Sequence, residues 1–211
     1  MALLTATRHN RTEIVELLLS IPESFAGQRL DINLQDKNGL TSLMIASRRG
    51  YTKIVELLLS RSDLNVNLQE VNGWTALIEA SQHGYTKIVE LLLSGSKRVY
   101  ITRSAGQRLD INIQDEWGMT ALIRASDYGH VEIVKLLLSR SETNVNLQNE
   151  YGWTALMVAS RHGHTAIVEQ LLLRSDIDVN FRSKYGSTAL IMASGNGRTE
   201  IVSLLENHIR I

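Results

Sequence analysis

Apolar residues along this chain follow a helical spacing in short segments that alternate with polar stretches. In residues 72–94, NGWTALIEASQHGYTKIVELLLS, the residues Ala76, Leu77 and Ala80 fall on one face of a helix, and a second apolar face runs from Ile88 to Leu93. The preceding stretch NVNLQEVNG (65–73) lacks this spacing and is rich in turn formers, which indicates a loop or hairpin. The pattern therefore predicts a hairpin followed by two short helices.

Polar residues and glycines mark the ends of these predicted helices. Thr75 is placed to cap the N-terminus of the first helix, and we expect Thr86 to cap the second. Gly84 is expected to end the first helix, because a left-handed backbone conformation costs least at glycine. Asn10 stands at that position in the first copy of the pattern, and asparagine is the usual second choice there.

The two-helix pattern is repeated along the chain. The hairpin glycine recurs every 34 residues, with one longer step of 45 residues between Gly73 and Gly118. The repetition predicts one domain of six units, at about residues 1–32, 33–66, 67–111, 112–145, 146–179 and 180–211, with inserts at 21–30 and 95–109. A single pair of short helices cannot bury its apolar face, whereas stacked neighbours can, so the pattern has to be repeated.

The period, the two-helix unit and the phrase T-x-L-x-x-A, as in Thr75–Ala80, resemble the ankyrin repeat over essentially the whole chain. The family's T-P-L-H appears here without its proline and histidine, and the loop after the second helix, such as Ser60–Asp63, is one residue longer. The resemblance implies an all-α ankyrin-repeat solenoid of stacked helix–turn–helix units with inter-repeat hairpin loops. It also implies that the hairpin tips protrude to one side and that the first helices line a concave face.

The close similarity of the units, and wording such as GWTALM, resemble the expanded ankyrin families of amoeba-infecting giant viruses, protists and intracellular bacteria. This resemblance implies a role in host–pathogen interaction. It also implies a cytoplasmic location, or the host-cell cytosol for a virus or an intracellular bacterium.

Composition narrows the function classes. The 211 residues include 22 basic and 22 acidic side chains, so the formal net charge is zero and gives no support for binding nucleic acid or a membrane surface. The chain has no cysteine, which excludes disulfides and thiol chemistry. Its start does not read as a signal peptide, and its apolar runs fall short of the roughly 20 residues needed to span a bilayer.

Residues capable of catalysis or metal binding are dispersed. The six histidines are spread along the repeats and lack the cysteine partners typical of zinc sites, so we expect no metal site and no cofactor. Ser81 recurs at the same position in five units, which indicates a structural role for a small side chain. Glu79 and Asp127 are expected on an exposed helix face as isolated acids, and we predict that the protein is not an enzyme.

Positions that vary between units are the candidates for binding a partner. They flank the hairpin glycine, or lie along and at the end of the first helix: Leu40, Trp74, Trp117, Met119, Tyr151, Trp153, Tyr185, Arg48, Arg49, Glu79, His83, Arg124, Asp127, Tyr128, Arg161 and His162. Large aromatic residues beside arginine are typical of interface hot spots. Alternatively, each tryptophan folds over its own hairpin and packs on the next unit.

These positions predict a non-enzymatic scaffold, expected to be a monomer, that binds a protein of unknown identity through its hairpin tips and concave helix face. The alternative is a structural or assembly role, as a segment of a longer ankyrin array or as a self-associating protein.

Two further features leave alternatives open. The inserts are either tolerated loop length or a secondary contact patch that uses Lys97, Arg98, Tyr100 and Arg103. Asn180, in LLRSDIDVN, resembles the ankyrin asparagine that an oxygen-dependent hydroxylase modifies. Alternatively, it bonds the turn backbone, as its counterparts at 33, 67, 112 and 146 would.

Overall fold

The computed structural model describes residues 1–21, 30–98 and 108–209, and at 95–98 it describes the backbone alone. The chain forms two compact units, Met1–Asp110 and Ile111–Ile211. Within the described residues, each unit contains six helices and no strand. The predicted insert patch of Lys97, Arg98, Tyr100 and Arg103 falls outside the described side chains.

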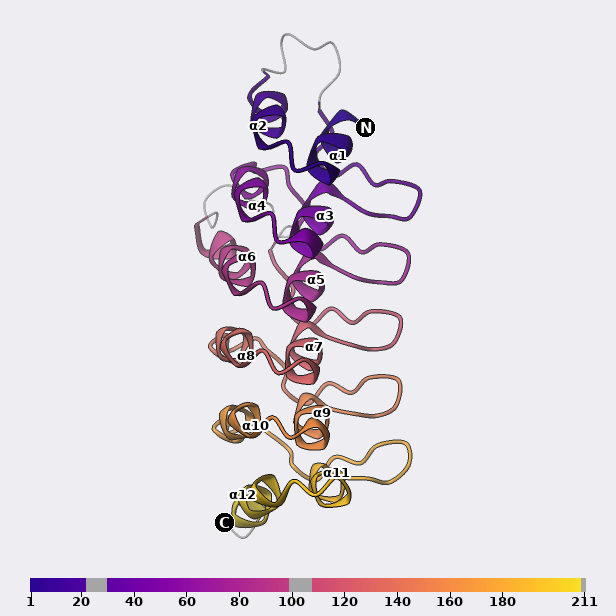
Figure 1. Ribbon diagram of the computed structural model, residues 1–211, viewed down its shortest axis with the longest axis vertical. Helices are drawn as coiled ribbons and strands as arrows, with labels where there is room; N and C mark the ends of the chain where they lie inside the picture. Colours follow the sequence, from indigo (N-terminus) through magenta and orange to yellow (C-terminus); the bar gives the residue numbers. More distant parts are fainter. Residues whose placement is uncertain (22–29, 99–107, 210–211) are drawn as a thin grey trace. The chain divides into compact units, whose positions relative to one another are not determined.

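The helices follow one another in pairs, as the sequence predicts (Figure 1). Unit 1 contains α1 (Ala2–Arg8), α2 (Thr12–Ser20), α3 (Ser42–Arg49), α4 (Thr52–Leu59), α5 (Ala76–Gln82) and α6 (Thr86–Arg98). Unit 2 contains α7 (Ala121–Asp127), α8 (Val131–Leu138), α9 (Ala155–His162), α10 (Thr165–Leu172), α11 (Ala189–Gly195) and α12 (Thr199–Ile209). The predicted all-α solenoid of helix–turn–helix units is confirmed.

A threonine side chain caps the N-terminus of the first helix in each pair, except in the pair α1–α2. The Oγ1 of Thr75 accepts the backbone N–H of Ile78 at 3.2 Å, and Thr41, Thr120, Thr154 and Thr188 act in the same way. Gly84 follows α5 with a φ of 75°, and Asn10 takes a φ of 52° after α1, so both predicted helix ends are confirmed.

The expectation that Thr86 caps a second helix is wrong. Helix α6 begins at Thr86 itself, and the carbonyl of Tyr85 accepts the first backbone bonds, from Ile88 and Val89. The turn between paired helices is so short that Tyr85 occupies the cap position. Helices α4, α8 and α10 likewise start without a side-chain cap.

Each unit buries its apolar residues between two rows of helices. In unit 1, α1, α3 and α5 form one row and α2, α4 and α6 the other, and α7 to α12 repeat this arrangement in unit 2 (Figure 1). Ile54, Leu58 and Leu92 are 0–1% exposed in unit 1, as are Ile167 and Leu171 in unit 2. Burying these side chains drives the stacking of neighbouring pairs.

The recurring serine is structural, as predicted. Ser47, Ser81, Ser126 and Ser160 are fully buried in the first helices, where only a small side chain fits between close neighbours. Their hydroxyls have no hydrogen-bond partner within the described part of the chain. Ser194 of α11, the last copy, is exposed instead.

An asparagine at the start of each of the first four hairpins joins successive repeats. The carboxamide of Asn33 donates to the carbonyl of Asp63 at 2.8 Å and accepts the N–H of Asn65 at 2.7 Å. Asn67, Asn112 and Asn146 make the same two bonds to the loop one repeat further on. We call this pair of bonds the asparagine clasp. The side chain bonds the next repeat rather than its own turn.

Candidate protein-binding surface

The residue before the hairpin glycine lies in the turn at the tip of each hairpin, where the glycine N–H donates to the carbonyl three residues earlier. The hairpins project to one side within each unit (Figure 1). In unit 2 this residue is aromatic in all three hairpins. Trp117 is 38% exposed, Tyr151 is 47% exposed and Tyr185 is 79% exposed. In unit 1 the equivalent residues are the exposed Asn38 and Asn72. The predicted aromatic tips are therefore found in unit 2.

Backbone bonds connect the aromatic tips of unit 2 directly. The N–H of Glu150 donates to the carbonyl of Trp117 at 2.8 Å, and the N–H of Lys184 donates to the carbonyl of Tyr151 at 3.0 Å. A glutamine ladder runs beside these bonds, with the Nε2 of Gln148 donating to the carbonyls of both Gly152 and Arg182. The spacing between the tips is thus fixed by the backbone before any partner binds.

An acceptor at the base of each hairpin holds its shape. The Oδ1 of Asp115 accepts the N–H groups of Trp117 at 3.0 Å and Met119 at 2.8 Å. Asp36, Glu70, Asn149 and Ser183 hold the other hairpins by the same two bonds. Sequence reasoning did not single out this position or the glutamine ladder, although both recur with the period of the repeats.

Residues after the hairpin glycine lie deeper than the tips. Leu40, Trp74 and Trp153 are half-buried, and Met119 is only 7% exposed. The Trp153 ring lies 5.7 Å from the Tyr151 ring, centroid to centroid, and the guanidinium of Arg161 sits 4.8 Å from its centre. Met119 was expected at the surface but packs beneath the hairpin, where its sulfur accepts from Asn149.

Arginine also contacts the aromatic tip of the first hairpin in unit 2. The guanidinium of Arg124 lies 5.8 Å from the centre of the Trp117 ring and donates to Asp115 Oδ2 at 2.7 Å. Cation–π contacts of this kind hold an aromatic face in one orientation. A hydrogen bond with Glu150 raises the pKa of Tyr151.

The varying position within the first helix is buried in four repeats, contrary to expectation, and is half-buried at Arg124. Glu79 is 0% exposed, and Ile45, Val158 and Met192 at the same position are 2–8% exposed. Glu79 Oε1 accepts from Arg48 Nε at 2.7 Å and also from Nη2 of that guanidinium. This bond raises the pKa of Arg48. Glu79 is thus an internal ion-pair partner rather than an acid on an exposed face.

The residues that end the first helices are more accessible. Arg49, His83, Arg161 and His162 are exposed, Tyr128 is 54% exposed, and Asp127 is half-buried. His162 Nδ1 lies 3.0 Å from Asp127 Oδ1 on the preceding repeat. In unit 2 these mostly polar side chains lie at the ends of α7 and α9, the helices that follow the hairpins with aromatic tips.

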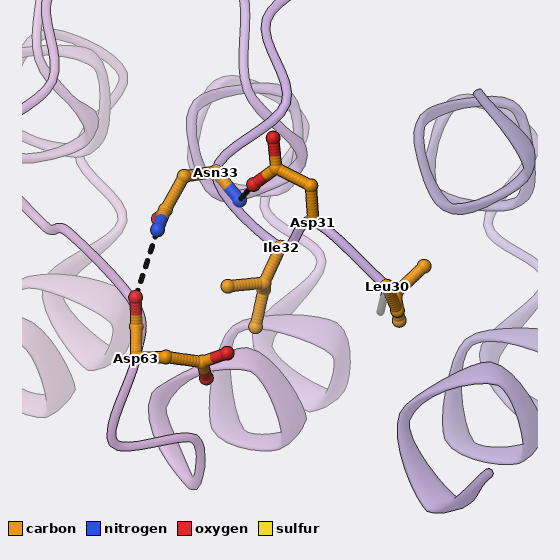
Figure 2. Close-up of a pocket in the computed structure, with 5 residues that line it drawn as sticks. All are labelled: Leu30, Asp31, Ile32, Asn33 and Asp63. Carbon is orange, nitrogen blue, oxygen red and sulfur yellow. Dashed lines mark hydrogen bonds between the residues drawn. The ribbon is translucent and has the colours of Figure 1, made fainter. Parts of the chain in front are cut away.

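None of these residues lines the pocket of about 260 Å³ in the clasp region of unit 1, which is formed by Leu30, Asp31, Ile32, Asn33 and Asp63. Figure 2 shows the carboxamide of Asn33 reaching across to Asp63, with Asp31 bonded to the Asn33 N–H. Arg61 binds both carboxylate oxygens of Asp63 at 3.0 Å. The carboxylates of Asp31 and Asp63 therefore already form hydrogen bonds that stabilise the loops.

Within the part of the chain that the structure describes, the side chains that could bind a metal do not gather. Among the described residues, no group of three or more His, Asp or Glu side chains is placed to hold an ion. None of the helices within those residues is long and apolar enough to cross a membrane.

Comparisons with known proteins agree with this arrangement of helices. The family model described as ankyrin repeats (3 copies) matches residues 3–104 and 98–183. The crystal structure of the ankyrin repeat protein EF0377 is similar at 28% identity and a TM-score of 0.81, with 97% of this chain and 96% of that chain covered. An ankyrin repeat domain from Acinetobacter baumannii AYE gives the same identity and TM-score, with 98% and 96% covered. No curated protein matches the sequence.

Proposed function

Since the chain belongs to the ankyrin repeat family, we propose that it is a non-enzymatic scaffold that binds a protein partner through the hairpin tips of unit 2. One observation carries the proposal, namely that three successive hairpins present Trp117, Tyr151 and Tyr185 at one repeat position, all exposed. A row of exposed aromatic residues on a rigid frame is costly to leave in water and typical of a binding surface.

The frame supports this role energetically. Backbone bonds at the carbonyls of Trp117 and Tyr151 fix the spacing of the tips. Arg124 orients the Trp117 ring. Less conformational entropy is then lost when a partner binds, because the spacing of the tips and the orientation of the Trp117 ring are already fixed.

A cytosolic setting, either in the organism's own cytoplasm or in that of a host cell, extends the proposal. The lack of cysteine fits a reducing compartment, and the repeat wording resembles ankyrin families that act on host cells.

The test is a comparison of two matched variants. A Trp117→Ala/Tyr151→Ala/Tyr185→Ala chain changes the tips of unit 2, and an Asn38→Ala/Asn72→Ala chain changes the same repeat position in unit 1. A partner captured by the wild-type chain is purified and titrated against both variants. We expect the aromatic variant to lose at least about 2 kcal/mol of binding free energy, and the asparagine variant to bind as the wild type does.

Thermal melting of both variants serves as the folding control, and the tip substitutions should leave the melting temperature nearly unchanged. A partner that binds the aromatic variant with full affinity would place the binding surface elsewhere.

A further inference from the structure

Two kinds of backbone bond set the distance between neighbouring hairpin tips in unit 2. Within the first hairpin of this unit, the N–H of Asp115 donates to the carbonyl of Met119 at 3.1 Å. Between hairpins, the N–H of Glu150 donates to the carbonyl of Trp117 at 2.8 Å. Since extended backbones joined by such bonds lie about 4.8 Å apart, these two steps place one tip about 9.6 Å from the next. This distance also agrees with the roughly 8–10 Å between packed helices.

The distance between tips favours one conformation of a bound peptide. A polyproline II helix has three residues per turn, so its side chains return to the same face every ~9.3 Å. A β-strand returns to the same face every ~6.6 Å, and an α-helix does so after about 5.4 Å, or after about 10.5 Å for a step of seven residues. Across three tips, polyproline II stays in register to within about 1 Å, whereas the seven-residue helical step drifts by about 2 Å.

The side chains at the tips have the chemistry that such a segment requires. Trp117 is 38% exposed and Tyr151 is 47% exposed, and Tyr185 occupies the same repeat position in the third hairpin. The half-buried ring of Trp153 lies 5.7 Å from the Tyr151 ring and widens the aromatic surface at the second tip. Proline-rich segments in the polyproline II conformation dock on aromatic side chains, and they lose little entropy because the conformation is preformed.

Charged side chains beside the tips change sign along unit 2. Glu116 and Glu150 immediately precede the first two tip residues, and both are exposed. In the third hairpin, the exposed residues Arg182 and Lys184 lie near the tip instead. The row of tips therefore runs from acidic to basic. Complementary charges on a bound segment would fix the direction in which it lies along the row.

Resting on the proposed function, we propose that the tips of unit 2 bind a proline-rich segment in the polyproline II conformation. Every third residue of the segment is a proline, and these prolines pack on Trp117, Tyr151 and Tyr185 in turn. A basic residue of the segment lies beside Glu116, and an acidic residue lies beside Lys184. An extended segment suits this surface because each hairpin presents one tip residue to it.

Three libraries of short displayed peptides test the spacing. The libraries carry prolines fixed at every second, every third or every fourth residue, and all other positions are random. Selection on the wild-type chain should enrich the every-third library above the other two. The enriched peptides should bind the Trp117→Ala/Tyr151→Ala/Tyr185→Ala chain at least about 30-fold more weakly, as expected when interface hot spots are removed. Circular dichroism melts establish that the variant is folded.

The outcomes separate this inference from the proposed function. Equal or stronger enrichment of the every-second or every-fourth library overturns the proline spacing, but loss of those peptides on the alanine variant keeps the tips as the binding surface. Enrichment of no library also overturns the inference and leaves the tips to a folded partner. Peptides that bind the alanine variant with full affinity lie elsewhere, and they contradict the proposed function as well.

The charge assignment has its own matched pair of variants. Glu116→Lys should weaken binding of an enriched peptide several-fold, because it places a like charge beside the basic residue of the segment. Glu132→Lys makes the same charge change at an exposed position on α8, in the other row of helices, and should bind as the wild type does. Glu150 is left intact in this test, since it is hydrogen-bonded to Tyr151. Equal affinities of the two variants would contradict the proposed direction of the segment.

Discussion

Glu79 occupies a position where three other repeats carry an aliphatic side chain, and its carboxylate is buried there against Arg48. Oε2 has no hydrogen-bond partner among the described residues, so Arg48 is the main compensation for the buried charge. The side chain of Arg48 remains 39% exposed. An ion pair of this type contributes less through attraction than it would cost if one partner were removed.

The cost of breaking this pair can be measured. Arg48→Met should lower the free energy of unfolding by about 3 kcal/mol, because it strands the buried carboxylate of Glu79. The double variant Arg48→Met/Glu79→Leu should be clearly more stable than Arg48→Met, since it replaces the pair with apolar packing. Urea denaturation gives both values. Equal stabilities of the single and double variants would contradict the buried-charge argument.

Asp36 makes stability depend on pH. Burial alone would raise the pKa of Asp36, but the N–H groups of Leu40 and Asn38 and the charge of Arg8 outweigh it and lower the pKa. A carboxyl whose pKa is lower when folded stabilises the protein above its unfolded pKa. That stabilisation is lost as the pH falls through the folded pKa, which places the loss below about pH 4.

Asp36→Asn tests this contribution, because Asn149 performs the same hairpin task with a carboxamide. The variant keeps the acceptor and loses the ion pair with Arg8. It should be less stable than the wild type at neutral pH and should approach the wild type as the solution is acidified. Urea melts across a pH series provide the comparison, and a stability difference that is constant with pH would refute the assignment.

Short helices in this protein are positioned by the hairpins between them as much as by their apolar faces. Gly118 has a φ of 73°, and a Cβ there would lie 2.8 Å from Asn149 Cα on the next hairpin. Gly186 has a φ of 78°, but a Cβ there would have no atom within 4 Å. The two glycines therefore share a backbone conformation and differ in whether a hairpin lies against them.

Alanine substitution at the two glycines separates these effects. Gly186→Ala should lose about 1–2 kcal/mol through its left-handed backbone conformation alone. Gly118→Ala should lose at least about 2 kcal/mol more, since the hairpins must move apart. Thermal or urea unfolding measures both, and equal losses would mean that the close approach of the hairpins contributes nothing.

At the level of helices and hairpins, the sequence predicts most of what the structure contains. Helix positions, the threonine caps of the first helices and the buried serines follow from periodicity, because the inner repeats bury the same face. Whether a residue that varies between repeats is buried or exposed does not follow from periodicity. Glu79 and Met119 were expected at the surface and are buried, since a residue that varies between repeats can still face the interior if its neighbours adjust. The asparagine clasp was missed because its partner lies one repeat away.

Across the whole chain, the burial of a residue depends on where its repeat stands in the array as well as on its position within the repeat. Ile54 and Ile14 are equivalent by sequence, yet Ile54 is fully buried and Ile14 is 49% exposed. Tip chemistry also changes along the chain, from asparagine in unit 1 to aromatic residues in unit 2. Both differences are invisible to a single repeat considered alone.

A matched pair of truncations follows from this dependence. Ile54→Ala should lower the free energy of unfolding by about 2–5 kcal/mol, as expected for a cavity in a packed interior. Ile14→Ala should cost about 1 kcal/mol or less, because the side chain is already half in water. Chemical denaturation of the two variants decides the question, and similar losses would show that the array buries both residues alike.

The asparagine clasp has a consequence for how such a chain can change over generations. Each carboxamide bonds only to a backbone carbonyl and a backbone N–H. Any loop of the right shape supplies these two groups, whatever its side chains are. If whole repeats are duplicated or deleted, the repeats on either side can therefore still form these two bonds with their new neighbours. The shared octapeptide AGQRLDIN ends at both Asn33 and Asn112, 79 residues apart, and fits a past duplication of a block of two repeats. The number of repeats and the residues on their surface can thus change independently in evolution, while the asparagine clasp between repeats stays the same.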